Sequence, residues 1–138
     1  MLDWLEERRE RLDPLEGMTL VVVDGRERLV GLVDTGPSDP VDRQVEVGIL
    51  IGRAEDRGKG LGREAMRVLL DHLVDDLGVH KVRALVMADN ARARAFHLAA
   101  GFVEEGLLRQ HRFVAGAWSD MVAMGLLADE HRQGRASS

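Results

Sequence analysis

Apolar positions in the first half of the chain predict one helix followed by three strands. Leucines and a tryptophan recur at helical spacing over residues 2–12 among charged residues, the pattern of an amphipathic helix. Runs of aliphatic residues over 18–23 and 29–33 flank Asp24-Gly25, a dipeptide typical of hairpin turns. A third strand is expected at about 43–51.

The third strand has two chemically different faces, because side chains two residues apart lie on the same face of a strand. One face carries Val45, Val47, Ile49 and Ile51, and the other carries Glu46, Gly48 and Leu50. A single carboxylate therefore interrupts an otherwise apolar strand.

The second half predicts a long helix, a buried strand, a short helix and two further strands. Apolar residues follow helical spacing over 61–77, and Gly78 stands where a left-handed helix cap belongs. Residues 79–87 are typical of a buried strand. The short helix is expected to begin after Asp89 or Asn90, either of which can cap it.

Gly101 is expected to end the short helix, and strands are expected at about 102–113 and 117–127. This order of elements predicts a mixed α/β (α+β) fold, in which one sheet is flanked by helices, as a single domain over residues 1–128. The polar residues 129–138 are expected to form a flexible tail.

Composition narrows the class of protein. The 138-residue chain has no cysteine, which excludes disulfides, thiolate metal sites and a cysteine nucleophile, and suits a reducing compartment such as the cytoplasm. No apolar run approaches the roughly twenty residues that cross a bilayer, so no membrane partner is expected. The net charge of −5 argues against a nucleic-acid partner. The histidines show no metal-ligand spacing, so no metal site is expected.

A glycine-rich loop lies between the third strand and the long helix. It reads Arg57-Gly58-Lys59-Gly60-Leu61-Gly62-Arg63. Glycines let the backbone approach a ligand closely, and the first turn of a helix offers unpaired N–H groups at the positive end of its dipole. The loop therefore predicts a binding site for a phosphate group.

Two common phosphate motifs do not match this loop. The dinucleotide fingerprint needs G-x-G-x-x-G, whereas the glycines here are spaced G-x-G-x-G. A nucleoside-triphosphate loop needs Ser or Thr after Gly-Lys, whereas Gly60 follows Lys59.

Arg57-x-x-Gly60-x-Gly62 instead resembles the (Gln/Arg)-x-x-Gly-x-(Gly/Ala) signature of the GNAT superfamily of N-acetyltransferases, which binds the pyrophosphate of acetyl-CoA. The strand before the loop and a later segment agree with that family in order and spacing. The later segment contributes Asn90, Ala93, His97, Gly101 and Phe102. The resemblance covers roughly residues 18–127 and implies a GNAT fold with a mixed, mostly antiparallel sheet.

The resemblance also implies roles for individual residues. The backbone of Ile49, Leu50 and Ile51 is expected to bond the pantetheine arm, and Asn90 is expected both to cap its helix and to contact that arm. Arg57, Gly58, Lys59, Gly60, Leu61, Gly62 and Arg63 are the expected phosphate-binding residues.

Two residues are expected to handle protons. Glu46 is the candidate base, and the alternatives are a solvent-facing carboxylate or one paired to an arginine. His97 stands where the family commonly places a tyrosine acid, and this chain has no tyrosine. Imidazole can replace that acid chemically, although a histidine without catalytic duty remains an alternative.

The resemblance predicts transfer of acetyl from acetyl-CoA to a primary amine by direct attack, closest to the branch of ribosomal-protein N-terminal and polyamine acetyltransferases. A non-catalytic acyl-CoA-binding module is the alternative, since the usual tyrosine is absent. For a polycationic acceptor, an attracting acidic rim is expected at Asp34, Asp39, Asp42, Glu104 and Glu105.

Members of the family usually start with a further strand and helix. The resemblance therefore implies a fold that is shortened at its N-terminus, with an acceptor pocket that is open or covered by another subunit. A homodimer is expected, because the late strands leave apolar surface to cover.

Overall fold

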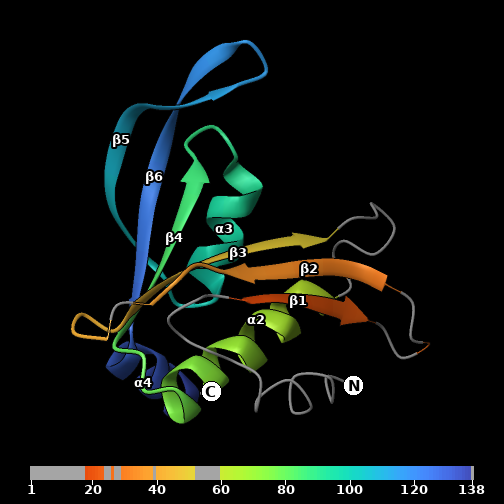
Figure 1. The fold of residues 1–138 in the computed structure, drawn as a ribbon, viewed down its shortest axis with the longest axis vertical. Helices are drawn as coiled ribbons and strands as arrows, with labels where there is room; N and C mark the ends of the chain where they lie inside the picture. The colour runs from red at the N-terminus through yellow and green to blue at the C-terminus, as the bar shows by residue number, and fades with distance from the viewer. Residues whose placement is uncertain (1–17, 24–25, 27–28, 39, 52–59, 138) are drawn as a thin grey trace.

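A computed structural model of the chain describes residues 18–23, 26, 29–38, 40–51 and 60–137 (Figure 1). The helix predicted over 2–12 and the turn at Asp24-Gly25 lie outside these residues. Six strands form one sheet in the order β1-β2-β3-β4-β6-β5. They are β1 (Met18–Val23), β2 (Leu29–Thr35), β3 (Gln44–Ile51), β4 (Lys81–Met87), β5 (Val103–Val114) and β6 (Ala117–Leu127).

Among the strands that the structure describes, four of the five neighbouring pairs are antiparallel, and only β3 and β4 are parallel. This confirms the predicted mixed, mostly antiparallel sheet. The parallel pair needs a crossover connection, which the long helix between β3 and β4 supplies.

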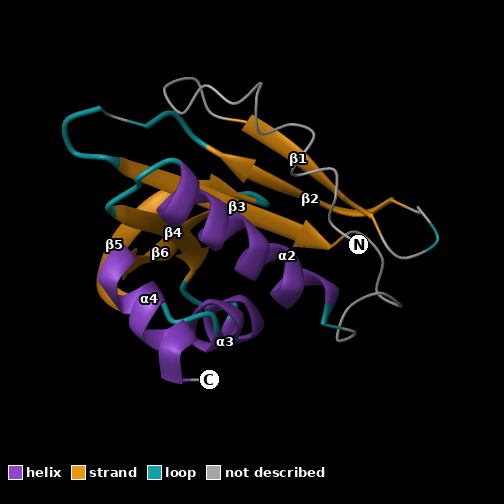
Figure 2. Cartoon of the chain, turned by 90° about the horizontal axis from the view of Figure 1, so that it is seen from below, coloured by secondary structure: helices purple, strands orange, loops and turns teal. Residues whose placement is uncertain are grey.

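The described helices lie together on one side of the sheet (Figure 2). They are α2 (Leu61–Asp71), continued by a π-helical turn η2 (His72–Asp76), then α3 (Ala91–Ala99) and α4 (Ala128–Ser137). Gly78 after η2 and Gly101 after α3 have positive φ angles of 68° and 103°, as expected for residues that follow helix ends.

The core lies between this helical layer and the sheet. Apolar residues at alternate positions of β3, β4 and β6 pack against the inner face of α2. They include Val45, Val47, Val82, Ala84, Val86, Val122, Met124 and Leu126 from the strands, and Met66, Leu69 and Leu70 from the helix. The predicted apolar face of β3 is thereby confirmed for Val45 and Val47, which are buried, and for Ile49, which is partly buried.

The sheet opens between β3 and β4. Their ladder joins only Gln44–Glu46 to Lys81–Arg83, after which β3 stays paired with β2 and β4 stays paired with β6. The two strands diverge beyond this point, which is visible in Figure 1. The edge of β3 that faces β4 therefore has no ladder partner after Glu46 in the part of the chain that the structure describes.

The prediction of a flexible tail at 129–138 is wrong, because most of this segment belongs to helix α4. His131 is buried and donates from Nε2 to Asp71 Oδ1 at 2.8 Å. Arg135 donates to the same oxygen at 2.8 Å and to Asp75 Oδ2 at 2.6 Å. These contacts are with the end of α2 and η2, some sixty residues earlier in the chain, so the polar local sequence did not reveal them.

Candidate functional site

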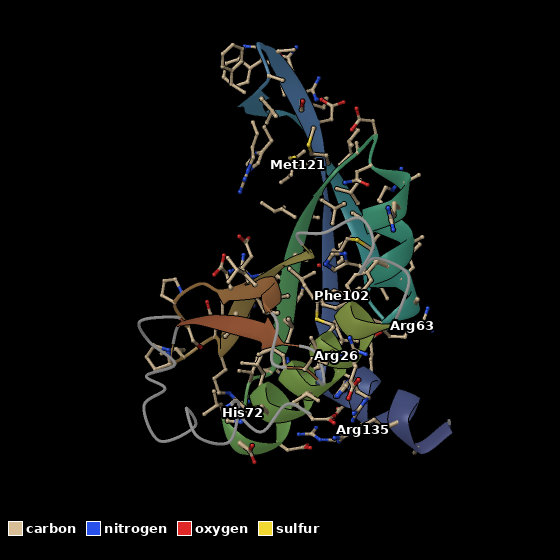
Figure 3. The ribbon with its side chains drawn as sticks, turned by 90° about the vertical axis from the view of Figure 1, so that its right-hand side faces the viewer. Arg26, Arg63, His72, Phe102, Met121 and Arg135 are labelled. Atoms are coloured by element: carbon tan, nitrogen blue, oxygen red, sulfur yellow. The ribbon has the colours of Figure 1, made fainter. Side chains whose placement is uncertain are left out.

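The N-terminus of α2 begins at Gly60, whose φ of 80° is a left-handed conformation that glycine adopts without strain. No side chain of the described residues caps this helix, and the first intrahelical bond runs from Glu64 N to Gly60 O at 2.9 Å. The amides of Leu61, Gly62 and Arg63 are therefore donors of the first turn that have no acceptor within the helix. Figure 3 shows Arg63 and His72 at opposite ends of α2.

These donors point out of the positive end of the helix dipole, which favours an anion there. Arg63 is exposed and adds a positive charge to the first turn. The remaining predicted phosphate-binding residues, Arg57, Gly58 and Lys59, lie outside the described residues.

Glu46 lies at the mouth of the opening between β3 and β4. Its side chain is half-buried on the face of the sheet opposite the helices, and it forms the last rung of the parallel ladder with Arg83. Among the residues that the structure describes, its carboxylate forms no ion pair. None of the described arginines therefore pairs with Glu46.

Gly48 keeps the surface next to Glu46 open. It is exposed, lies on the same face of β3, and a Cβ added there would meet no atom within 4 Å. Its partner across the β2–β3 ladder is Asp34, which is also exposed. A ligand can therefore approach Glu46 along this part of the sheet.

His97 lies on the other side of the sheet, within α3. It is buried, and its ring makes edge-to-face contacts with Phe96 and Phe102 at centroid distances of 5.4 and 5.2 Å. Nδ1 donates to Ala93 O at 2.8 Å, whereas Nε2 is buried and has no partner among the residues that the structure describes. In the neutral ring Nε2 therefore carries the lone pair, and only the doubly protonated ring has a proton to donate from that atom.

Asn90 caps α3, as predicted. Its side-chain oxygen accepts from Ala93 N at 3.0 Å, and its backbone oxygen accepts from Arg94 N at 3.1 Å. The side-chain amide nitrogen has no partner within the described part of the chain, and Asn90 is exposed. The cap consumes the oxygen and leaves the two amide hydrogens available for a ligand.

Two of the expected rim carboxylates are already engaged. Glu104 accepts two hydrogen bonds from Arg94, which lower the pKa of its carboxyl group, and Glu105 lies 2.8 Å from Lys81 Nζ. The Glu105 carboxylate crosses over Gly125, where a Cβ would come within 2.7 Å of it. Neither pairing could be predicted from the sequence, because no local spacing joins Arg94 or Lys81 to its glutamate.

Two other classes of site find no support in the described residues. Their His, Asp and Glu side chains form no group of three that could hold a metal ion. None of their helices is long and apolar enough to span a membrane.

Comparison with known proteins identifies the class. Residues 1–103 match the acetyltransferase (GNAT) domain family. The chain is 31% identical over 139 residues to the spermidine N(1)-acetyltransferase of Vibrio cholerae serotype O1, with 93% of this chain and 80% of that protein covered. It is 23% identical over 95 residues to the ribosomal-protein-serine acetyltransferase of Escherichia coli K12, with 69% of this chain and 52% of that protein covered.

Solved structures agree with these matches. The spermidine/spermine N-acetyltransferase SpeG from Vibrio cholerae, in complex with manganese ions, superposes with a TM-score of 0.81 at 30% identity, over 97% of this chain and 79% of that one. The fold and the matches define an acetyltransferase. The chain belongs to the GNAT family and is an N-acetyltransferase that transfers an acetyl group to an amine.

Proposed function

We propose that the amine nitrogen attacks the thioester carbonyl of acetyl-CoA directly, in the opening between β3 and β4. Enzymes of this family take their acetyl group from acetyl-CoA. The new C–N bond forms as the C–S bond breaks, the ammonium proton passes to a base, and the CoA thiolate leaves. No covalent enzyme intermediate is needed, and the chain has no cysteine to form a thioester of its own.

The backbone N–H groups at the N-terminus of α2 and the open edge of β3 support a location for acetyl-CoA. Its pyrophosphate is assigned to the N-terminus of α2, at Gly60, Leu61, Gly62 and Arg63, with Arg57, Gly58 and Lys59 added from the sequence motif. Its pantetheine arm is assigned to the free edge of β3 at Ile49, Leu50 and Ile51, because an extended chain can bond such an edge like an added strand. Asn90 contributes its amide hydrogens.

Glu46 is proposed as the base that takes the ammonium proton, directly or through a water molecule. The observation that carries this assignment is a half-buried carboxylate, without an ion pair in the described structure, at the last rung before the strands part. Gly48 leaves room beside it for the amine.

His97 is proposed to protonate the leaving thiolate from the helical side of the sheet. Its unpartnered Nε2 supports this role, and the doubly protonated ring is the form that acts. A thiol has a pKa of about 8.5, so its thiolate leaves readily and the acid makes a modest contribution.

A polyamine is proposed as the acceptor, as the name of the Vibrio relative indicates for that enzyme. Asp34 supports this assignment, because it lies diagonally from Glu46 on the same face, at a Cα separation typically of about 7–8 Å. A second ammonium group of the acceptor can pair with Asp34 while the first reacts beside Glu46. Glu104 and Glu105 contribute little, since Arg94 and Lys81 already neutralise them.

The test is a thiol-release assay with acetyl-CoA and three acceptors: spermidine, butylamine and a peptide with a free N-terminal serine. Asp34→Asn should raise the KM for spermidine several-fold and leave the KM for butylamine unchanged. Asp129→Asn is the matched control, because Asp129 lies on α4 and pairs with Arg132. If the enzyme acetylates the peptide and does not acetylate spermidine, the acceptor is a protein N-terminus and the polyamine assignment is wrong.

We also propose that the enzyme is a cytoplasmic homodimer. Phe113 and Trp118 are 63% and 62% exposed, their ring centroids lie 5.3 Å apart, and both belong to the projecting hairpin of β5 and β6 (Figure 1). Exposed aromatic pairs of this kind support a protein contact.

A further inference from the structure

Arg94 on α3 joins three elements through one guanidinium group. Its Nε and one terminal nitrogen donate to the two carboxylate oxygens of Glu104 at 3.0 and 3.1 Å. The other terminal nitrogen donates to the backbone oxygen of Ala88 at 2.9 Å. The start of β5, the end of β4 and the first turns of α3 are thereby held in one planar arrangement.

The connection from β4 to α3 is what this arrangement fixes. Ala88 N donates to Asp120 O at 2.9 Å and Asn90 N donates to Met87 O at 2.9 Å, so two backbone donors of the connection are satisfied. Its acceptor at Ala88 is satisfied by Arg94. Asn90, which is assigned above to the cofactor arm, is two residues from that carbonyl.

The ion pair itself contributes little to global stability. The Arg94 and Glu104 side chains are 37% and 33% exposed, and ion pairs of this exposure are typically weak. Hydrogen bonding lowers the pKa of Glu104 and raises that of Arg94, so both groups are charged at neutral pH. The two parallel hydrogen bonds from Arg94 to Glu104 instead fix the orientation of the guanidinium group, because its donors lie in one plane at fixed angles.

We propose that Arg94 is a positioning residue for acetyl-CoA: held by Glu104, it fixes the carbonyl of Ala88 and so orients the Asn90 amide toward the cofactor arm. This inference rests on the proposed role of Asn90. It assigns a function to a side chain that touches neither the acetyl group nor the acceptor.

The test compares KM values for acetyl-CoA and for the amine in four variants of the full chain. Arg94→Gln and Glu104→Gln should each raise the KM for acetyl-CoA about fivefold to tenfold, the effect of one lost hydrogen bond, with kcat and the amine KM unchanged. Arg94→Lys should behave like Arg94→Gln, because an ammonium group cannot form the fork. Arg92→Gln is the control, an exposed arginine in the first turn of the same helix.

Two further variants separate positioning from stability. Asn90→Ser keeps a capping oxygen and removes the amide donor, so it should raise the KM for acetyl-CoA at least as much as Arg94→Gln. The charge-exchanged double variant Arg94→Glu/Glu104→Arg should not recover the loss, because a glutamate at position 94 cannot donate to the Ala88 carbonyl. Melting temperatures should not follow the KM values across the set.

An unchanged KM for acetyl-CoA in Arg94→Gln, with a raised one in Asn90→Ser, would overturn the inference and leave the proposed function standing. A raised KM in Arg94→Gln alone would also overturn it, since Arg94 would not act through Asn90. The proposed function fails separately, if the wild type releases no thiol from acetyl-CoA with any amine.

Discussion

Glu46 and Arg83 stand opposite each other in the last rung of the parallel ladder between β3 and β4. Side chains paired in this way share a face of the sheet, and the described structure places no ion pair between these two. An amine that approaches the opening therefore meets a carboxylate on one strand and a guanidinium on the next. The carboxylate is the group able to accept its proton.

Replacing Glu46 by Gln should lower kcat about a hundredfold or more at pH 7, the usual contribution of a general base. Coenzyme A binding should be unchanged in calorimetry, because the pyrophosphate and pantetheine contacts are elsewhere. The deficit should shrink as the pH approaches about 10, where the amine loses its own proton. Gln44→Ala, two residues earlier on the same face, is the control. An equal loss of kcat in both variants would show that Glu46 is not the base.

Replacing His97 by Phe tests the proposed acid without emptying its place between Phe96 and Phe102. The variant should fold, since an aromatic ring remains in the core, and kcat should fall about tenfold, below the usual effect of an acid because thiolate is a good leaving group. Steady-state kinetics and thermal melting are the measurements. Full activity with unchanged stability would make His97 a packing residue only.

Gly60 and Gly78 provide a matched pair at the two ends of the long helix. Both have positive φ, 80° and 68°, and an added Cβ would meet nothing within 4 Å at either position. Alanine should therefore cost about 1–2 kcal/mol of stability at each site through backbone strain alone. Only Gly60→Ala should also raise the Kd of coenzyme A in calorimetric titration. Equal Kd values for Gly60→Ala and Gly78→Ala would show that the N-terminus of α2 does not bind the phosphate.

The sequence predicts the fold well where periodicity carries the information. Alternation predicts the buried face of β3, and the short helix after Asn90 begins and ends as its cap and Gly101 indicate. The opening between β3 and β4, which backbone geometry creates, is harder to predict from the sequence. Nothing in the side-chain pattern of β3 or β4 shows that their ladder stops at Glu46 and Arg83, because that depends on the twist of the whole sheet.

Contacts between distant residues were also beyond sequence reasoning. Arg94 reaches Glu104 across a helix end, and Lys81 reaches Glu105 over a glycine of a third strand. Glu104 and Glu105 therefore look like free rim charges in the sequence and are paired in the structure. The burial of His97, whose Nε2 has no partner among the described residues, was hidden from the sequence for the same reason, because it depends on tertiary packing.

The exposed aromatic pair on the β5–β6 hairpin predicts how a dimer can be dissociated. Trp118→Ser and Phe113→Ser should each shift the protein toward monomer in sedimentation equilibrium, because each removes apolar area from the proposed contact. Leu98→Ser is the control, a 49% exposed apolar residue on α3. A monomeric wild type, or variants as dimeric as the control, would contradict the proposed interface.

Arg135 on α4 predicts a pH-dependent difference in stability. Its hydrogen bonds lower the pKa of Asp75 below the ordinary value of 3.8, chiefly through the bond to that carboxylate. A carboxyl group whose pKa is lowered by folding stabilises the folded state above its unfolded pKa and loses that effect as the pH falls through the folded value. Arg135→Gln should therefore melt a few degrees below wild type at pH 7.

The two melting temperatures should converge as the pH falls from about 4 toward 2, since Asp75 then takes up a proton in both proteins. Arg132→Gln should show a smaller difference at pH 7, because Arg132 pairs with Asp129 three residues earlier in the same helix and does not tie α4 to α2. Thermal melts across this range measure both effects. A difference for Arg135→Gln that persists unchanged at pH 2 would show that the loss is one of packing and not of the ion pair.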